Sequence, residues 1–435
     1  MEGGYQFSRY NNQFCRNGRH YLWNTLSNAF LELDEDDIQY LEQEGSPDTQ
    51  SPLFKPLYNN GCIVRESFDE LGKVLFEEKA VMTAFDPETL QFTIAPGFGC
   101  NYDCVYCFEH HRSAAKHMSS DTKNAVCRFI INATERHASL KSIRITWFGG
   151  EPLLYKSDIA DISYRLMEYC GTRNIRYDAG IVTNGRFLDP DTALMLKALN
   201  IRYVQLSFDG TRKVYMKQKK ASSSDYYITI QNICNCADLL PITIRINIRD
   251  DPSDAIDLTD YFLNEQNLDG KIKMYVAHIR DYTRDDAASE RFSHERFLEA
   301  QGRYMQLFGE NGKFNSKSFC YISPKRRYTT CATVCRYNCC IGPDGELYRC
   351  EHYFGDVKKV IGTVFDGYFN NEQDLRYLFF QHPDVCKACS MFPICLGGCM
   401  NDAMNGEISL SCEALKNRWI DMLMLYHQTE KGGTV

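Results

Sequence analysis

Short runs of apolar residues alternate with longer helical patterns along the middle of the chain. The runs predict six β-strands, at residues 91–96, 143–148, 178–183, 202–208, 241–248 and 271–278. One helical pattern opens at Ser120 and places Ala125 and Phe129 one turn apart, and another extends from about 189 to 199. Six strand–helix repeats predict an α/β fold whose parallel sheet curves into an incomplete barrel, a partial (β/α)6 barrel over residues 86–310.

The pattern before the barrel predicts a separate N-terminal domain over residues 1–85. A helix is expected to begin at Asp34, because acidic residues fill its first turn. The dipeptide Asn60-Gly61 is a turn signal that precedes an apolar pair, so we expect a β-hairpin there. A helix followed by a hairpin predicts a small winged-helix-like domain.

The pattern after the barrel predicts a third domain over residues 311–435. The charged stretch 280–290 is expected to be a linker, and a helix at about 295–308 follows it. Eleven of the 20 cysteines in the chain lie in this last region, between Cys320 and Cys412.

Composition narrows the class of protein. The chain has 435 residues and a formal net charge of −8, which argues against a nucleic-acid partner. No apolar run reaches the ~18 residues of a membrane span, and the N-terminus lacks a secretory pattern, so we expect a cytoplasmic protein with no membrane partner. Short basic runs at 217–220 and 325–327 are expected to be solvated loops. In a cytosolic chain, clustered cysteines indicate metal binding or catalysis rather than disulfides.

The candidate chemistry follows the ends of the predicted strands, where active-site groups gather in such folds. A cysteine triplet with C-x3-C-x2-C spacing follows the first strand, at Cys100, Cys104 and Cys107. Three thiolates can hold three irons of a four-iron cluster and leave the fourth iron open, because such clusters normally take four thiolates. A zinc site lacking one ligand is the alternative, although structural zinc takes four closed ligands.

The run from Gly99 to Glu109 resembles the signature of the radical S-adenosylmethionine (SAM) enzymes. The resemblance implies that SAM chelates the open iron and is cleaved by one electron to a 5′-deoxyadenosyl radical. A second motif of that family follows the second strand, where two glycines allow close backbone approach and a carboxylate can accept bonds from an ammonium group. The residues that the resemblance assigns to SAM binding are Tyr106, Gly149, Gly150, Glu151, Pro152, Ser207, Asp209, Arg245 and Asn247.

The C-terminal cysteines resemble the SPASM domain, the Cys-rich extension of radical SAM enzymes that modify peptides. The resemblance implies two auxiliary [4Fe-4S] clusters, and so three in all. The expected ligands of the first are Cys331, Cys335, Cys350 and Cys399, and those of the second are Cys386, Cys389, Cys395 and Cys412. A run of zinc knuckles is the alternative for this region. Cys339 and Cys340 are expected to be packing residues, as buried thiols usually are.

Two further expectations concern the reaction itself. Glu351 follows a predicted cluster ligand, at a place where some family members carry the acid that takes the substrate proton, and His352 competes for that role. The segment Thr211–Lys220 departs from the family, since many relatives carry a His-Asp pair and an Arg there, so no role is transferred to it.

The resemblance implies a maturase of ribosomally made peptides. The N-terminal domain would hold a leader sequence of the precursor peptide by β-strand addition, on a strand near 5–14 or 61–65. The expected product is a thioether from a Cys sulfur, and the electron donor would be a flavodoxin or ferredoxin. The alternatives are a carbon–carbon or carbon–oxygen crosslink, sulfatase formylglycine maturation, and a non-catalytic iron–sulfur electron carrier.

Overall fold

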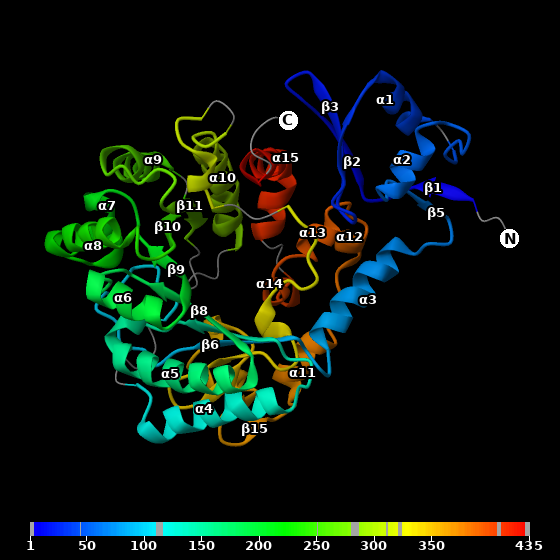
Figure 1. Ribbon diagram of the computed structural model, residues 1–435. Coiled ribbons are helices and arrows are strands. Elements are labelled where there is room, and N and C mark those ends of the chain that lie inside the picture. The colour runs from blue at the N-terminus through cyan, green and yellow to red at the C-terminus, as the bar shows by residue number, and fades with distance from the viewer. Residues whose placement is uncertain are drawn as a thin grey trace. The chain divides into compact units, whose positions relative to one another are not determined.

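The computed structural model describes residues 4–43, 45–109, 116–249, 251–279, 287–309, 312–320, 324–406 and 410–430. The chain divides into two compact units (Figure 1). The smaller unit consists of Met1–Ala84, Ile322–Cys331 and Phe379–Tyr426, and the larger of Phe85–Tyr321, Ala332–Leu378 and His427–Val435. Residues of the predicted third domain therefore contribute to both units.

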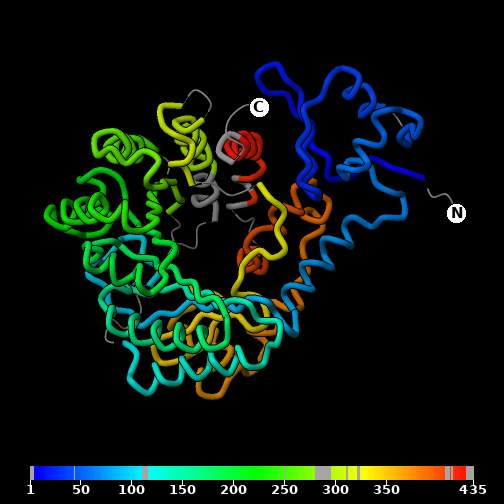
Figure 2. The backbone as a smooth tube through the Cα atoms, viewed as in Figure 1, coloured from blue at the N-terminus to red at the C-terminus, as the bar shows by residue number. Residues whose placement is uncertain are grey.

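A parallel sheet forms the centre of the larger unit, and all six predicted strands are confirmed. They are β6 (Thr89–Ile94), β7 (Ser142–Trp147), β8 (Arg176–Thr183), β9 (Ile201–Ser207), β10 (Ile242–Ile248) and β11 (Lys273–His278). Each pairs in parallel with its sequence neighbour, in the order β11-β10-β9-β8-β7-β6. Figure 2 follows this path of the backbone. Ile94, Trp147 and Ile181 are fully buried, as expected when helices cover one face of a parallel sheet.

Four short strands extend this sheet beyond β6, and their pairing with the barrel was not predicted from the sequence. They are β12 (Cys339–Ile341), β13 (Glu346–Tyr348), β14 (Gly362–Thr363) and β15 (Gly367–Tyr368). β12 pairs in parallel with β6, so that Ile341 lies opposite Ile94, and β13 to β15 continue in antiparallel fashion. The sheet thus joins the segment that ends at Cys350 to the strand that leads to Cys100.

Most helices of the larger unit connect consecutive strands of the barrel along the chain. They are α4 (Ser120–Glu135), α5 (Lys156–Arg173), α6 (Pro190–Ala198), α7 (Arg212–Lys219), α8 (Ser223–Cys236), α9 (Ser253–Asp260), α10 (Ala287–Met305) and α11 (Glu372–Leu378). The Ser119 side chain caps α4 by accepting from the Thr122 N–H. α10 begins earlier than the helix expected at 295, so residues 287–290 of the predicted linker are helical, while 280–286 lie outside the described residues.

The N-terminal part of the smaller unit combines two small sheets with three helices. β2 (Asn11–Arg16), β3 (Arg19–Asn24) and β4 (Phe30–Leu33) form an antiparallel sheet, and β1 (Tyr5–Phe7) pairs with β5 (Ile63–Arg65). The helices are α1 (Glu35–Glu42), α2 (Phe54–Asn59) and α3 (Glu70–Met82). The helix expected at Asp34 is confirmed, since Asp34 and Asp37 form a capping box.

The hairpin expected at Asn60-Gly61 is wrong. Asn60 caps the C-terminus of α2, and Gly61 follows with a φ of 72°. A left-handed glycine after a helix is a common way to end it. The Asn-Gly dipeptide therefore marks the end of a helix here. The strand that follows it, β5, pairs with β1 near the start of the chain.

The C-terminal part of the smaller unit packs against this N-terminal part. It contains α12 (Asp384–Lys387), α13 (Phe392–Cys395), α14 (Met400–Met404) and α15 (Leu410–Glu430). The Thr25 hydroxyl donates to the carbonyl oxygen of Ser390 at 2.5 Å, and the Ser390 hydroxyl donates to Asn12 at 2.6 Å. Trp419 on α15 stacks on Trp23 with ring centroids 5.4 Å apart. No helix in the described part of the chain is long and apolar enough to cross a membrane.

Candidate active site

The cysteine triplet lies in the loop between β6 and α4. Burial raises the pKa of the Cys100 thiol to about 12, and negative charge on Cys104 and Cys107 contributes, so the three sulfurs lie near one another. Backbone N–H groups point at two of them, from Tyr102 to Cys100 Sγ and from Glu109 to Cys107 Sγ, each at 3.4 Å. N–H groups directed at sulfur stabilise a thiolate or a sulfur-bound cluster.

The glycine pair after β7 packs directly on the start of this loop. A Cβ added to Gly149 would lie 2.5 Å from the Gly97 carbonyl oxygen, and one added to Gly150 would lie 2.4 Å from that of Gly99. The Glu151 N–H also donates to the Gly99 oxygen, at 2.8 Å. The close approach that these glycines permit is therefore to the cluster loop itself, while contact with SAM stays a prediction.

The Glu151 carboxylate is fully buried and bonded within the protein. One oxygen accepts from the Leu153 N–H at 2.9 Å and the Thr183 hydroxyl at 2.7 Å, and the other accepts from the Asn184 N–H at 2.8 Å. Burial raises the pKa of Glu151, and the three donated bonds oppose that rise. Glu151 thus ties the end of β7 to the end of β8, which makes its side chain a positioning group.

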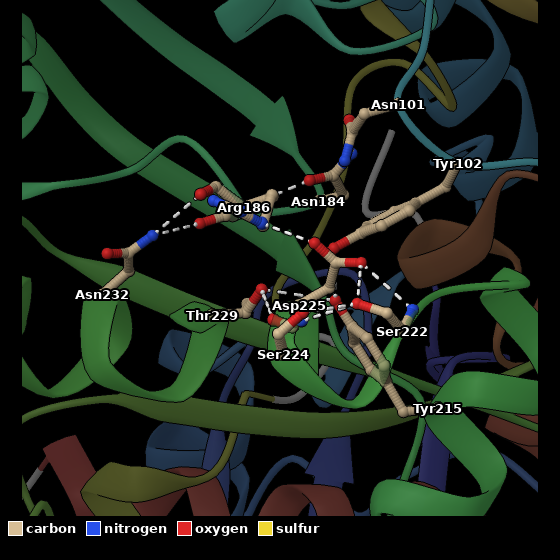
Figure 3. Close-up of polar contacts among 11 residues, drawn as sticks. Asn101, Tyr102, Asn184, Arg186, Tyr215, Ser222, Ser224, Asp225, Thr229 and Asn232 are labelled. Carbon is tan, nitrogen blue, oxygen red and sulfur yellow. Dashed lines mark hydrogen bonds and ion pairs between the residues drawn. The ribbon is translucent and has the colours of Figure 1, made fainter. Parts of the chain in front are cut away.

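The other side of the cluster loop is held to the end of β8 and to α7 (Figure 3). The Asn184 amide donates to Asn101 at 2.8 Å, and its nitrogen also lies 4.0 Å from Cys100 Sγ. The hydroxyls of Tyr102 and Tyr215 are 3.0 Å apart. These contacts fix the first cysteine of the triplet relative to the barrel.

A buried network lies beside the second cysteine and contains several of the predicted SAM contacts. The Tyr106 hydroxyl donates to Asp209, which also accepts from the Asn247 amide at 2.8 Å. Arg245 donates to the Asn247 side-chain oxygen at 3.0 Å. The predicted residues at the ends of β9 and β10 thus meet the cluster loop at one place.

Lys219 completes this network, and the sequence interpretation missed it. Its side chain is 1% exposed, and its ammonium lies 3.5 Å from Asp209 and 3.0 Å from the Ser207 hydroxyl. Burial disfavours its charged form, but Asp209 and Tyr106 raise the pKa of Lys219 well above its ordinary value. The expectation of a solvated basic loop at 217–220 is wrong here, because α7 continues to Lys219 and carries it inward.

The end of α7 also lies along the cluster loop. The Val105 N–H donates to the Gln218 carbonyl oxygen at 2.8 Å, and Lys220 pairs with Asp103 at 2.6 Å on the surface. The segment in which the chain departs from the family pattern therefore supports the loop that carries the triplet.

Replacing Lys219 with methionine is expected to destabilise the iron-free protein by about 3–5 kcal/mol, because it leaves a buried carboxylate on Asp209 without its ion pair. The midpoint of thermal unfolding should fall by several degrees. Lys220→Met is the matched control: its exposed pair with Asp103 should be worth less than ~1 kcal/mol. Equal midpoints for the two variants would contradict the role assigned to Lys219.

The segment after Cys350 reaches the cluster loop through aromatic contacts. The His352 ring stacks on Phe108, the residue after Cys107, with centroids 4.3 Å apart and planes 7° from parallel. Phe148 lies next to both Phe108 and Phe354, with centroids 6.4 Å away in each case. The thiol of Cys340 lies 4.0 Å from the Glu351 carboxylate. His352 is thus in contact with the triplet loop, whereas Glu351 lies next to Cys340 of β12.

The cysteines expected to bind the second auxiliary cluster lie together in the smaller unit. Burial raises the pKa of Cys395 to about 12, and negative charge on the other three expected ligands, Cys412, Cys389 and Cys386, adds to the rise. A Cβ added to Gly397 would lie 3.5 Å from Cys386 Sγ. Four neighbouring thiols fit the demands of a four-thiolate cluster.

A buried carboxylate–histidine pair lies against this site. Glu78 on α3 and His382 are joined at 2.6 Å through the histidine Nε2. The His382 Nδ1 atom is buried, has no hydrogen-bond partner among the described residues, and lies 3.1 Å from the same Gly397 Cβ position. The pair connects the helix that follows the N-terminal sheet to the Cys386 segment.

The ligands expected for the first auxiliary cluster are divided between the two units. Cys335 and Cys350 belong to the larger unit, whereas Cys331 and Cys399 belong to the smaller one. Cys331 is close enough to Cys399 to contribute to the raised pKa of that thiol, after burial and the nearby Asp402. Cys339 and Cys340 are fully buried, which confirms their expected packing role.

The donor chemistry suits clusters of several irons. Within the described ranges, no three His, Cys, Asp or Glu side chains are grouped so that they could hold a single metal ion. A four-iron cluster makes a different demand, because each thiolate binds its own iron. Three thiols after β6, with one position left to another ligand, fit the group that the triplet predicts.

Comparison with known proteins agrees with this geometry. The radical SAM superfamily model matches residues 94–252. A cysteine-type anaerobic sulfatase-maturating enzyme of Clostridium perfringens is 22% identical over 333 residues, which are 69% of this chain and 86% of that protein. The radical SAM cyclopropyl synthase TigE of Paramaledivibacter caminithermalis is 24% identical over 415 residues, covering 87% of this chain and 80% of TigE.

Among solved structures, Streptococcus suis SuiB bound to precursor peptide SuiA has a similar fold. The alignment covers 93% of this chain and 97% of SuiB, with a TM-score of 0.50 and 17% identity. The matched domain spans the cysteine triplet, the glycine pair and the network around Asp209. It is the domain that binds SAM and one [4Fe-4S] cluster. The chain therefore carries a radical SAM domain and is a radical SAM enzyme.

Proposed function

We propose that this enzyme is a maturase that abstracts hydrogen from a ribosomally made precursor peptide and forms a crosslink in it, a thioether from a Cys sulfur. The observation that carries the proposal is the stacking of His352 on Phe108, which joins the segment after Cys350 to the triplet loop. A group that could handle a substrate proton thus lies beside the place where the radical would form.

Cys100, Cys104 and Cys107 would hold the SAM-binding cluster. When bound there, SAM and the cluster supply a 5′-deoxyadenosyl radical after one-electron reduction by a flavodoxin or ferredoxin. The chain's own part is to keep the loop in place. Glu151 fixes the end of β7 against β8, and Lys219 with Asp209 fixes the second half of the loop.

The remaining eight expected ligands would hold two auxiliary [4Fe-4S] clusters, which would accept the electron that leaves the substrate or bind a substrate thiolate. The support comes from the neighbouring thiols around Cys395 and from the proximity of Cys331 to Cys399.

The N-terminal sheet supports a peptide substrate. β2 and β4 are its outer strands, and an outer strand offers backbone groups to an added peptide strand. Within the stretches expected to bind the leader, 5–14 and 61–65, β1 and β5 pair with each other, whereas β2 is an outer strand of the three-stranded sheet and is our candidate for leader binding. SuiB, whose structure contains a precursor peptide, covers 93% of this chain, including this region in large part.

Maturation of a sulfatase by oxidising Cys or Ser to formylglycine is the second candidate. The relative from Clostridium perfringens favours it, but that alignment covers 69% of this chain, against 87% for TigE. The peptide proposal makes use of the N-terminal sheet, which the sulfatase proposal leaves without a role.

Replacing Glu351 with glutamine is expected to lower peptide crosslinking by about 10²- to 10⁴-fold, which is the usual range for general-base catalysis. SAM cleavage should continue, because the change is not in the triplet loop. The measurement compares 5′-deoxyadenosine with modified peptide by mass spectrometry. His352→Gln is the matched variant, and a selective loss there would assign the base to His352 instead.

The proposed function is tested by anaerobic reconstitution with iron and sulfide, followed by incubation with SAM and dithionite. We expect 5′-deoxyadenosine and about twelve irons per chain, for three four-iron clusters. Peptides encoded beside the gene, added with a sulfatase-derived Cys peptide as the comparison, then identify the substrate class. Iron without SAM cleavage would favour an electron carrier, and bound zinc with little iron would overturn the cluster assignment.

A further inference from the structure

Arg349 is a fully charged side chain in the interior of the larger unit, 2% exposed, immediately before Cys350. It follows β13, and its guanidinium points into the loop that contains Cys335. The oxygens that accept from it are the backbone carbonyls of Thr333, Cys335, Arg336 and Asn338, at 3.1, 2.6, 2.9 and 2.7 Å. Four carbonyls of one loop thus converge on one side chain.

The positive charge of Arg349 is balanced by Asp374 on α11. This carboxylate accepts from Arg349 Nε at 2.7 Å and is 3% exposed. The loop is closed from the other side as well. The Thr333 hydroxyl donates to the Arg349 carbonyl oxygen at 2.7 Å, and Asn338 accepts from the Gln91 N–H of β6 at 3.0 Å. The loop is therefore held both to β13 and to the barrel.

We propose that Arg349 is the positioning residue of the first auxiliary [4Fe-4S] cluster, because it fixes the loop of Cys335 against Cys350 before any iron is bound. This inference rests on the proposed function, in which both cysteines bind that cluster. A planar guanidinium presents five N–H donors in fixed directions, whereas a lysine offers a single point charge. Contacts with four carbonyls and one carboxylate at once require the several donors of an arginine, which a lysine cannot supply in these directions.

Packing alone does not account for a charge in this place. A buried ion pair often contributes no more to stability than apolar residues of the same volume would. What the guanidinium adds is a defined loop conformation, since each carbonyl must point inward. A loop with its carbonyls directed at Arg349 has its two ligand-bearing ends, at Cys335 and Cys350, set by the protein.

The test compares Arg349→Lys with wild type after anaerobic reconstitution. We expect the variant to lose about four of twelve irons per chain and to lack one of the reduced-cluster signals in the electron paramagnetic resonance spectrum. SAM cleavage should stay within about twofold of wild type, because the triplet is untouched. Arg176→Lys is the matched control, since Arg176 is an exposed arginine on β8, and it should keep all twelve irons.

A second measurement does not depend on how the variant folds. In the iron-free wild type, hydrogen exchange at the Cys335 and Asn338 amides, which donate to the Ala332 and Cys335 carbonyls, should be at least about tenfold slower than in an unstructured peptide. Fast exchange there would overturn the inference, as would a full set of irons in Arg349→Lys. A wild type that holds only four irons would instead overturn the auxiliary clusters of the proposed function, and the inference with them.

Discussion

Replacing any one of Cys100, Cys104 and Cys107 with alanine is expected to abolish SAM cleavage, with a loss of at least about a thousandfold. Each thiolate holds one iron of the cluster, and without the cluster no electron reaches SAM. All three cysteines lie in one loop, which is held between β7, β8 and α7. The loss of any one of them should therefore have the same effect. The rate of 5′-deoxyadenosine formation with dithionite measures the effect, and the iron count should fall by about four per chain.

Cys127→Ala is the control for this prediction. Cys127 is buried on α4, close in sequence to the triplet, and its thiol only packs. The variant should lose little stability and keep both its irons and its rate of SAM cleavage. Normal cleavage in a triplet variant, or a matching loss in Cys127→Ala, would remove the triplet from the centre of the reaction.

The barrel could be predicted because its signals are local. Each strand is a short apolar run, the helices between them carry their own caps, and parallel pairing of sequential strands places all their ends at one edge. The expectation that the triplet, the glycine pair and the residues around Asp209 meet at that edge followed from this rule alone. The structure bears it out in the bonds from Glu151 to Asn184 and from Tyr106 to Asp209.

What could not be predicted depends on contacts between distant segments. β12 is three residues long and pairs with β6, more than two hundred residues earlier, so no local pattern marks this pairing. Lys219 stands in a run of basic residues that resembles a solvated surface, and only the direction of α7 carries it inside. Arg349 likewise looks like an ordinary strand residue until the loop of Cys335 folds around it.

The N-terminal and C-terminal segments show the same limitation at the level of domains. The sequence suggests a separate recognition domain and a separate Cys-rich domain, whereas the hydrogen bonds of Ser390 join the loop between Cys389 and α13 to the N-terminal sheet. Such packing leaves no trace in local patterns. It also places the proposed leader-binding strands and the second cluster site in one compact unit.

Replacing Glu151 with glutamine is the second change expected to have a large effect. The carboxylate accepts three bonds, and a glutamine in either orientation would turn an N–H donor toward at least one of these donors. Leaving buried groups unsatisfied costs about 1–3 kcal/mol. Because Asn184 also holds Asn101 in the cluster loop, we expect SAM affinity to fall by about 10- to 100-fold, as measured by isothermal titration of the reconstituted enzyme.

Iron content separates this prediction from a general loss of structure. The thiolates are untouched, so Glu151→Gln should keep all the irons of the wild type while SAM binding and cleavage fall together. Glu168→Gln, on the exposed side of α5, makes the same chemical change without a buried bond and should leave both unchanged. If Glu151→Gln bound and cleaved SAM as the wild type does, the Glu151 carboxylate would have no part in forming the SAM site.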